Sequence, residues 1–469
     1  MNRYLLSFIF ILTCMTTALA QHKDITGSWN GALSIGEAKL RIVINLSTAP
    51  DGKLIATMDS PDQGAKGIPV SETKLVNDSI FLDIKAIGGS YAGKITSPTT
   101  IDGNLKQAGR SMNIPLTKGD AAIAKKPQEP TKPYPYQETE VTIENKVADI
   151  KLAGTLTLPL NAKAQLPAVV LISGSGPQDR DQTIMGHKPF LVLADHLTRQ
   201  GFAVLRLDDR GVGKSGGKFA IATTEDFASD IEAAYTYLKN FNKVNPKKVG
   251  LIGHSEGALV AAKVAAKHPE TAFVVLMAGN GVPGTELLVS QNEALLKTAG
   301  VPQDLMQKYL QLRKAQFEVA ATEKDTQKAA AKIRQLEQDT KANLTEQEQK
   351  QLGLSAQSEQ TIVDQLGTPW MRYYLAYDPA PTLSKLKMPV LAINGTKDLQ
   401  VPSQQNLTAT EKALKAAGNK KYTIKPLPGL NHLFQTANTG GPAEYGQLQE
   451  TIAPFTLDLI ADWMKEIVK

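Results

Sequence analysis

A serine at residue 255 lies at the centre of the pentapeptide Gly-His-Ser-Glu-Gly, residues 253–257. The apolar run 249–252 before it predicts a buried strand, and the alanine-rich run 258–266 after it predicts a helix. Such a turn is so tight that the glycines at its two ends must lack side chains. The turn places the hydroxyl of Ser255 at its apex, above the helix N-terminus, where the N–H of Glu256 faces a developing negative charge. We predict a nucleophilic serine; the alternative is a tight turn with a purely structural role.

A hydroxyl attacks only when a base removes its proton, and histidine is the usual base. The chain has six histidines, so each can be weighed. His432 lies in a loop just after the predicted strand 422–427, and we predict that it is the base. His187 also lies in a predicted loop and stays an alternative. The remaining four lie at the front of the chain, beside the nucleophile or in helical runs: His22, His254, His196 and His268.

A base of this kind needs a carboxylate that fixes the imidazole tautomer and stabilises the imidazolium. Asp398 lies in the loop 395–402, directly after the predicted buried strand 388–394. Taken alone, this residue could be a solvated turn former. The order Ser255, Asp398, His432 along the chain is, however, the order found in α/β-hydrolases. We therefore predict that these three residues form a catalytic triad.

The oxyanion of acyl transfer needs a second N–H donor besides that of Glu256. We expect this donor in the loop 173–176, whose small residues follow a predicted strand and let the backbone approach a reacting carbonyl. By position we choose the N–H of Ser175, with Gly176 as the alternative. The side chains of residues 178–181 either contact substrate or, as we expect, hold the loop through a pair between Arg180 and a carboxylate.

Gly213-Lys214-Ser215 imitates the end of a phosphate-binding loop. Asp208 stands where that motif requires glycine, so we expect no bound nucleotide. The segment instead resembles the Asp-x-Arg-Gly-x-Gly-x-Ser turn of α/β-hydrolases, which braces the oxyanion loop.

From about residue 140 to its end, the chain resembles a serine α/β-hydrolase. The segments that carry this resemblance are GSGPQDRD, DDRGVGKS, GHSEG, PWMRYYLAYDP, INGTKDLQVP and GLNHLF. Together they are similar to secreted bacterial carboxylesterases that carry a β-rich domain in front. The resemblance implies a carboxylesterase that forms an acyl-enzyme on Ser255 and needs no metal or cofactor.

Two other functions stay open at this point. Peptidases, lipases and thioesterases share the triad motifs, so a serine peptidase or amidase is the first alternative. It would need a charged clamp for a peptide terminus, which the sequence does not reveal. The alternative from another class is a non-catalytic carbohydrate- or lipid-binding protein, against which the three triad residues argue.

The first twenty residues have the pattern of a cleavable secretory signal peptide. A basic start at Met1-Asn2-Arg3 precedes an apolar run over 5–15, and Ala18-Leu19-Ala20 resembles a cleavage site. The apolar run is too short to span a membrane. We therefore expect a periplasmic or secreted protein that begins near Gln21.

Composition narrows the chemistry further. The single cysteine, Cys14, lies in the signal segment, so we expect no disulfide, catalytic thiol or cysteine metal site. The net charge of +6 is spread along the chain, which argues against a nucleic-acid partner. A small-molecule ester is the expected partner, and the protein is expected to be a monomer or homodimer.

The remaining patterns predict an α/β-hydrolase core with a helical cap insertion, preceded by a small all-β domain. Short alternating strands favour a barrel or sandwich in front, and amphipathic helical runs favour the cap. Within the cap, Trp370 and Tyr374 either line the substrate pocket or pack the cap against the core. The expected domains are a signal peptide (1–20), an all-β domain (21–120), a proline-rich linker (121–139), the first part of the core (140–284), the cap (285–379) and the second part of the core (380–469).

Overall fold

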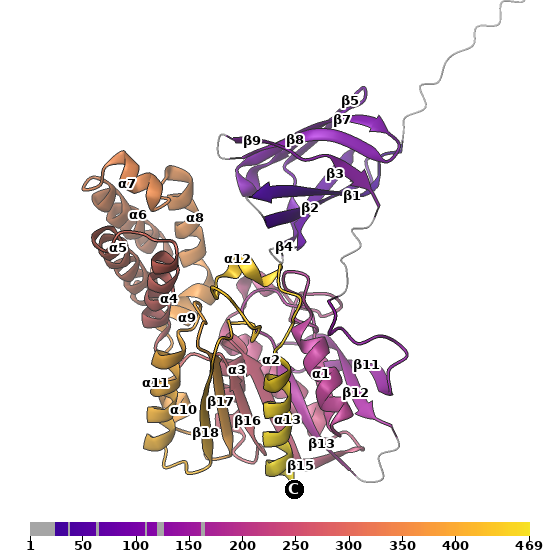
Figure 1. Cartoon of the computed structure of the whole chain (residues 1–469), viewed down its shortest axis with the longest axis vertical. Coiled ribbons are helices and arrows are strands. Elements are labelled where there is room, and N and C mark those ends of the chain that lie inside the picture. Colours follow the sequence, from indigo (N-terminus) through magenta and orange to yellow (C-terminus); the bar gives the residue numbers. More distant parts are fainter. Residues whose placement is uncertain (1–23, 36–37, 62–64, 108–109, 120–125, 161–164) are drawn as a thin grey trace, which may run out of the picture. The chain divides into compact units, whose positions relative to one another are not determined.

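The computed structural model describes residues 24–35, 38–61, 65–107, 110–119, 126–160 and 165–469. The predicted signal peptide, Cys14 and His22 lie outside these residues. The chain divides near residue 121 into two compact units. Figure 1 shows a first unit built from β1 to β10 and a second unit that runs from β11 to α13.

The first unit is a ten-stranded sheet in the order β4-β3-β2-β1-β10-β8-β7-β6-β5, with β9 paired to β8. Along β7 and β8, side chains alternate between buried and exposed, because successive residues of a strand face opposite sides. The buried set forms one apolar core around Trp29. The prediction of an all-β domain is confirmed. The strands are β1 (Gly27–Ile35), β2 (Ala38–Thr48), β3 (Leu54–Ser60), β4 (Ala65–Pro69), β5 (Glu72–Val76), β6 (Ser79–Ile84), β7 (Gly89–Ser97), β8 (Thr100–Gln107), β9 (Arg110–Asn113) and β10 (Leu116–Lys118).

The second unit contains an eight-stranded sheet in the order β11-β12-β14-β13-β15-β16-β17-β18. Strand β12 is antiparallel to β11 and β14, and the strands from β14 to β18 are parallel. Parallel strands in the interior of a sheet are covered on both faces, which is why β13, β14, β16 and β17 are apolar runs in the sequence. The strands are β11 (Tyr136–Asn145), β12 (Ile150–Pro159), β13 (Leu166–Ile172), β14 (Ala203–Leu207), β15 (Val244–His254), β16 (Val274–Met277), β17 (Val390–Gly395) and β18 (Tyr422–Leu427).

Helices cover both faces of this sheet (Figure 1). Helices α1 (Pro189–Arg199) and α13 (Pro454–Val468) pack on one face. Helices α2 (Thr224–Lys239), α3 (Glu256–Lys267) and α11 (Ser403–Ala416) pack on the other, together with the short α10 (Ala380–Leu383). Because the parallel strands end at one edge, the loops after β13, β14, β15, β17 and β18 meet there.

The cap is an insertion between β16 and β17, and the prediction of a helical cap is confirmed. Figure 1 shows its helices grouped beyond one end of the sheet. The last of them, α9, packs against α4, α5, α8 and α2, so it joins the cap to the core. The cap helices are α4 (Gly284–Thr298), α5 (Gln303–Thr322), α6 (Thr326–Lys341), α7 (Glu346–Gln351), α8 (Ala356–Gly367) and α9 (Pro369–Ala376).

The start of the second unit is bonded to a segment near its end. Lys126 and Gln128, within the stretch predicted to be a linker, bond to backbone groups of residues 446–452. The last residues of the predicted linker, from Tyr136 onward, belong to strand β11.

Among the described helices, none is long and apolar enough to cross a bilayer.

Candidate active site

Ser255 occupies the turn between β15 and α3 in a strained backbone conformation. Its φ is 55° and its ψ is −121°, a region that non-glycine residues avoid. Its N–H donates to the carbonyl of Met277 at 2.8 Å, and its carbonyl accepts from the N–H of Ala258 at 3.0 Å. These bonds fix both sides of the serine, so the hydroxyl is held at the edge where the parallel strands end.

The glycines on either side of Ser255 have the role that the sequence predicts. A Cβ on Gly253 would lie 2.0 Å from the carbonyl oxygen of Gly257. A Cβ on Gly257 would lie 2.2 Å from the carbonyl oxygen of Ile172. Both distances are below any van der Waals contact, so only glycine lets α3 start this close to the sheet.

His432 and Asp398 form a buried pair. The Nδ1 of His432 lies 2.8 Å from Oδ2 of Asp398, and the side chains are 5% and 0% exposed. The other oxygen, Oδ1, accepts from the N–H groups of Gln400 at 2.8 Å and Val401 at 2.9 Å. Because Nδ1–H donates to the carboxylate, Nε2 is left as the unprotonated nitrogen, which is the state a general base requires.

The turn that carries His432 is braced by its neighbour Asn431. The amide oxygen of Asn431 accepts from the N–H groups of Leu433 and Gln435, both at 3.0 Å. The backbone N–H of Asn431 donates to the carbonyl of Gln435 at 3.0 Å. Within this turn Phe434 has a φ of 63°, which these bonds hold in place.

The elbow and the His432 turn are joined through His254. The Nε2 of His254 lies 2.9 Å from the carbonyl oxygen of His432, and the two rings are 4.8 Å apart. Burial lowers the pKa of His254 to about 3, so its ring is neutral at neutral pH. Because Ser255 follows His254 directly, this bond brings the predicted nucleophile and base to one place.

The loop after β13 lies against the elbow and is anchored by carboxylates. Asp209 accepts from Oγ of Ser173 at 2.7 Å and from the N–H of Gln178 at 2.9 Å, and burial raises its pKa to about 7. The guanidinium of Arg180 donates twice to Asp208, at 3.0 and 2.8 Å. The expectation that Arg180 holds the loop through a carboxylate is confirmed.

Within this loop, Gly174 lies close to Ser255. A Cβ on Gly174 would lie 3.2 Å from Cβ of Ser255. Ser175, the predicted second oxyanion donor, is the next residue and is exposed. Sequence reasoning missed Gly174; the only signal was its place between two small residues.

Glu256 begins α3 directly after Ser255, and its side chain bonds to the cap. As the first residue of α3, it has an N–H with no acceptor inside the helix. Its buried carboxylate accepts from Oγ1 of Thr224 at 2.6 Å and from Nε1 of Trp370 at 2.8 Å. Burial raises the pKa of Glu256. The elbow is thereby bonded to α2 and to cap helix α9.

Trp370 and Tyr374 stack on each other with their centroids 5.5 Å apart. The hydroxyl of Tyr374 accepts from Nδ2 of Asn280 at 2.6 Å, and the ring is buried. These contacts favour the interpretation in which the two rings pack the cap against the core.

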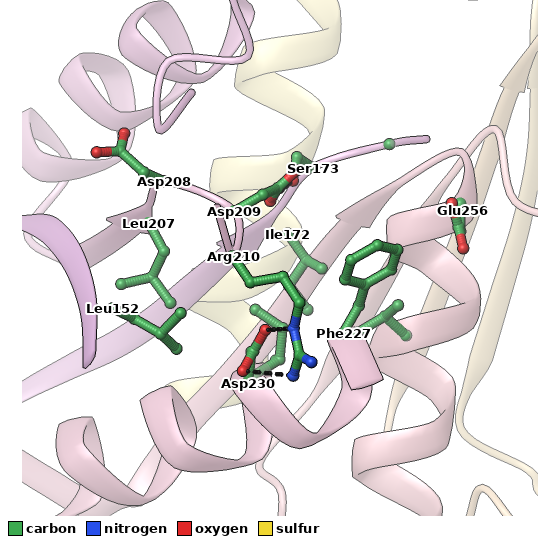
Figure 2. A pocket seen from close by; sticks show the side chains of 13 residues that line it. Leu152, Ile172, Ser173, Leu207, Asp208, Asp209, Arg210, Phe227, Asp230 and Glu256 are labelled. Atoms are coloured by element: carbon green, nitrogen blue, oxygen red, sulfur yellow. Dashed lines mark hydrogen bonds and ion pairs between the residues drawn. The ribbon is translucent and has the colours of Figure 1, made fainter. Parts of the chain in front are cut away.

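A small cavity lies beneath the loop after β13, between Asp209 and Glu256 (Figure 2). On its floor Arg210 donates to both oxygens of Asp230, at 2.7 and 2.9 Å. Its free volume is about 30 Å³, enough for about one water and far too little for an ester substrate. Across the described ranges, no group of three or more His, Cys, Asp or Glu side chains is arranged to hold a metal.

His187, the alternative base, is buried, and both of its ring nitrogens are bonded. Its Nδ1 bonds to Oγ1 of Thr451 and its Nε2 to the carbonyl of Tyr445, both at 2.9 Å. Burial lowers the pKa of His187 to about 4. With both nitrogens engaged, it has none to offer Ser255.

Comparisons with known proteins agree with this architecture. A family model described as serine aminopeptidase, S33, matches residues 188–436, more than half of the chain. The esterase EstD of Thermotoga maritima is 26% identical over 339 residues, which cover 71% of this chain and 68% of that protein. The prediction of a carboxylic-ester hydrolase agrees with this relative.

Solved structures with similar folds include two esterases. That of Pyrococcus furiosus has a TM-score of 0.43 at 15% identity and covers 73% of this chain and 96% of its own. Est1E of Butyrivibrio proteoclasticus, solved with ferulic acid, has a TM-score of 0.40 at 18% identity and covers 70% and 97%. By the family match, the chain belongs to the serine aminopeptidase S33 family of the α/β-hydrolase superfamily.

Proposed function

We propose that the protein is a serine carboxylesterase that forms an acyl-enzyme on Ser255. The observation that carries the proposal is the buried Asp398–His432 pair, whose turn is bonded through His254 to the strained elbow. The similarity to EstD supports an ester rather than another acyl compound as substrate.

In the proposed mechanism, Oγ of Ser255 attacks the ester carbonyl while Nε2 of His432 takes its proton. The N–H groups of Glu256 and Ser175 stabilise the oxyanion, each worth about 10²–10³-fold in rate. His432 then gives the proton to the leaving alcohol, and Asp398 stabilises the imidazolium. Water, activated by the same histidine, hydrolyses the acyl-enzyme and frees Ser255.

A serine aminopeptidase is the second candidate, because the matching family model carries that description. An aminopeptidase needs an acidic group to bind the substrate ammonium. Glu256 is the carboxylate next to the nucleophile, but it is buried and already bonded to Thr224 and Trp370. This engagement favours the esterase.

A substrate panel separates the two candidates. We expect nitrophenyl esters to be hydrolysed at least about 10²-fold faster in kcat/KM than aminoacyl anilides, with both activities absent from Ser255→Ala. Faster anilide cleavage would identify a peptidase. An absence of both activities in the wild-type protein would favour the non-catalytic binding function.

We also propose that the protein acts in the periplasm or outside the cell. This rests on the signal-peptide pattern of residues 1–20. N-terminal sequencing of the protein recovered from its host is expected to begin at Gln21. A protein that still begins at Met1 and fractionates with the cytoplasm would contradict this location.

A further inference from the structure

His254 links the turn of Ser255 to the turn of His432, yet the proposed mechanism gives it no role. Its ring is buried against His432, at 4.8 Å, and Phe434, at 6.1 Å between centroids. A residue that only filled this space would be apolar, because an unpaired ring nitrogen in the interior is costly. Both nitrogens of His254 are instead bonded.

The two bonds fix one tautomer of the ring. The carbonyl oxygen of His432 can only accept, so Nε2 of His254 carries the proton and donates to it at 2.9 Å. Nδ1 is then an acceptor, and the partner at 2.7 Å is the amide nitrogen of Gln182, which can only donate. Gln182 itself has a φ of 52°, so its backbone is held in an unusual conformation where this amide is presented.

We propose that His254 is a positioning residue, whose Nε2–H holds the backbone of His432 at the distance from Ser255 that proton transfer requires. Gln182 is the second positioning residue, because its amide selects the Nε2–H tautomer. The catalytic consequence rests on the proposed triad mechanism. The bonding pattern does not, and it can be tested separately.

A matched pair of substitutions separates positioning from space filling. In His254→Gln, the amide nitrogen can occupy the place of Nε2 and still donate to His432. In His254→Asn, the amide oxygen can replace Nδ1 and accept from Gln182, but no donor reaches His432. Both variants keep a polar side chain, so they differ chiefly in the hydrogen bond to the carbonyl of His432.

We expect His254→Asn to lower kcat for a nitrophenyl ester about 10²-fold with KM changed less than about threefold, because a misplaced base costs rate rather than binding. His254→Gln is expected to retain kcat within about fivefold, as a rescue by the remaining donor. His268→Asn is the control, a histidine at the far end of α3 that bonds to Glu232 and Glu270, and it is expected to leave kcat unchanged.

The pH profile adds a readout that packing alone would not give. His254 is faced by His432, Gln182 and Phe434. Because His254 stays neutral, the kcat ratio of wild type to His254→Asn is expected to be constant from pH 6 to 9. A ratio that changes tenfold over this range would overturn the proposal, since a titrating group would then account for the difference.

The following results decide whether His254 positions His432. If the Asn and Gln variants lose the same activity, or if the loss is in KM, His254 does not position His432. Should a variant fail to fold, histidine ring ¹⁵N spectra of the wild-type protein serve instead. A neutral Nε2–H tautomer of His254 in the wild-type protein supports the proposal, and an Nδ1–H tautomer overturns it. If fluorophosphonate does not label Ser255 in the wild-type protein, the proposed function fails rather than this inference.

Discussion

The hydroxyl of Ser255 is displayed by a backbone conformation that costs on the order of 1–3 kcal/mol for an ordinary residue. Two glycines and two backbone hydrogen bonds over-determine that conformation, so the strain persists in the folded chain. Such strain is a common feature of sites where a side chain must stand clear of its own backbone. It supports a nucleophilic role better than the pentapeptide alone.

Substitutions at the three triad positions test their roles directly. We expect Ser255→Ala and His432→Ala to lower kcat for ester hydrolysis about 10⁴-fold or more, because the first removes the proposed nucleophile and the second removes the proposed base. Asp398→Asn is expected to retain more activity, since the ring of His432 stays in place. Steady-state kinetics on a nitrophenyl ester measure all three. Near-normal activity in His432→Ala would show that another group is the base.

Burial of His187 is predicted to affect the stability of the protein rather than its catalysis. Its pKa of about 4 in the folded chain lies below the usual 6.5, so between these values only the unfolded chain binds the proton. Between pH 4 and pH 6.5, the free energy of unfolding therefore rises with pH. Burial of neutral His187 contributes about 1.4 kcal/mol per pH unit to this rise, and the contribution is lost as the pH falls. Urea unfolding of wild type and His187→Gln, compared at pH 7.5 and pH 5, isolates the effect.

We expect His187→Gln to be less stable than wild type at pH 7.5 and to recover part of that deficit at pH 5. The other titrating groups are common to both proteins, so they cancel in the difference. An equal difference at the two pH values would contradict burial of a neutral His187.

At this scale, the positions of Ser255, Asp398 and His432 after strands β15, β17 and β18 were predictable from the sequence, because each follows a recognisable strand. The roles of His254 and Gln182 were not. His254 bonds to residues 72 and 178 positions away, and no local pattern specifies such partners. The approach of Gly174 to Ser255 likewise depends on how two loops meet.

Helix α9 is the element that joins the cap to the elbow. Trp370 donates from Nε1 to the buried carboxylate of Glu256. Trp370→Phe keeps a ring but removes this donor, so we expect the free energy of unfolding to fall by about 1–3 kcal/mol. We expect the optimum of ester chain length to stay unchanged, as measured with nitrophenyl esters of increasing acyl length.

Trp370→Ala tests the other interpretation of the same residue. An upward shift of the optimum toward longer acyl chains would show that the ring limits the substrate pocket. Lower Tm with an unchanged profile would show that it packs the cap against the core.

Secondary-structure elements with strong patterns were predictable, and irregular connections were not. The strands β13, β14 and β17 coincide with apolar runs, because interior parallel strands are buried on both faces. The proline-rich stretch before β11 was predicted to be a stiff linker. Part of it is docked by Lys126 and Gln128, whose partners lie more than 300 residues away.

For the whole molecule, the two compact units predict that the second can be produced alone. We expect a shortened protein that starts at residue 126 to fold and to react with fluorophosphonate at Ser255. A protein that starts at residue 135 lacks the bonds of Lys126 and Gln128 and is expected to have a lower Tm. A folded protein starting at 126 that is not labelled would show that the β unit helps to build the site.

The order of the strands could be anticipated at this scale only through family resemblance. Loops separated by more than 250 residues meet at one edge of the sheet because the parallel strands all end there. Apolar runs reveal which segments are strands but not which neighbours they pair with. The sequence likewise did not distinguish a barrel from a sandwich for the first unit, which in its described part is a single sheet.

The central claim is that Ser255 forms the covalent intermediate, and mass spectrometry of the fluorophosphonate-treated full-length protein tests it most directly. We predict one adduct per chain, located on the peptide that contains Ser255, with parallel loss of ester hydrolysis. Ser255→Ala is expected to remain unlabelled. An adduct on a different residue, or full activity in a protein that carries the adduct on Ser255, would contradict the account.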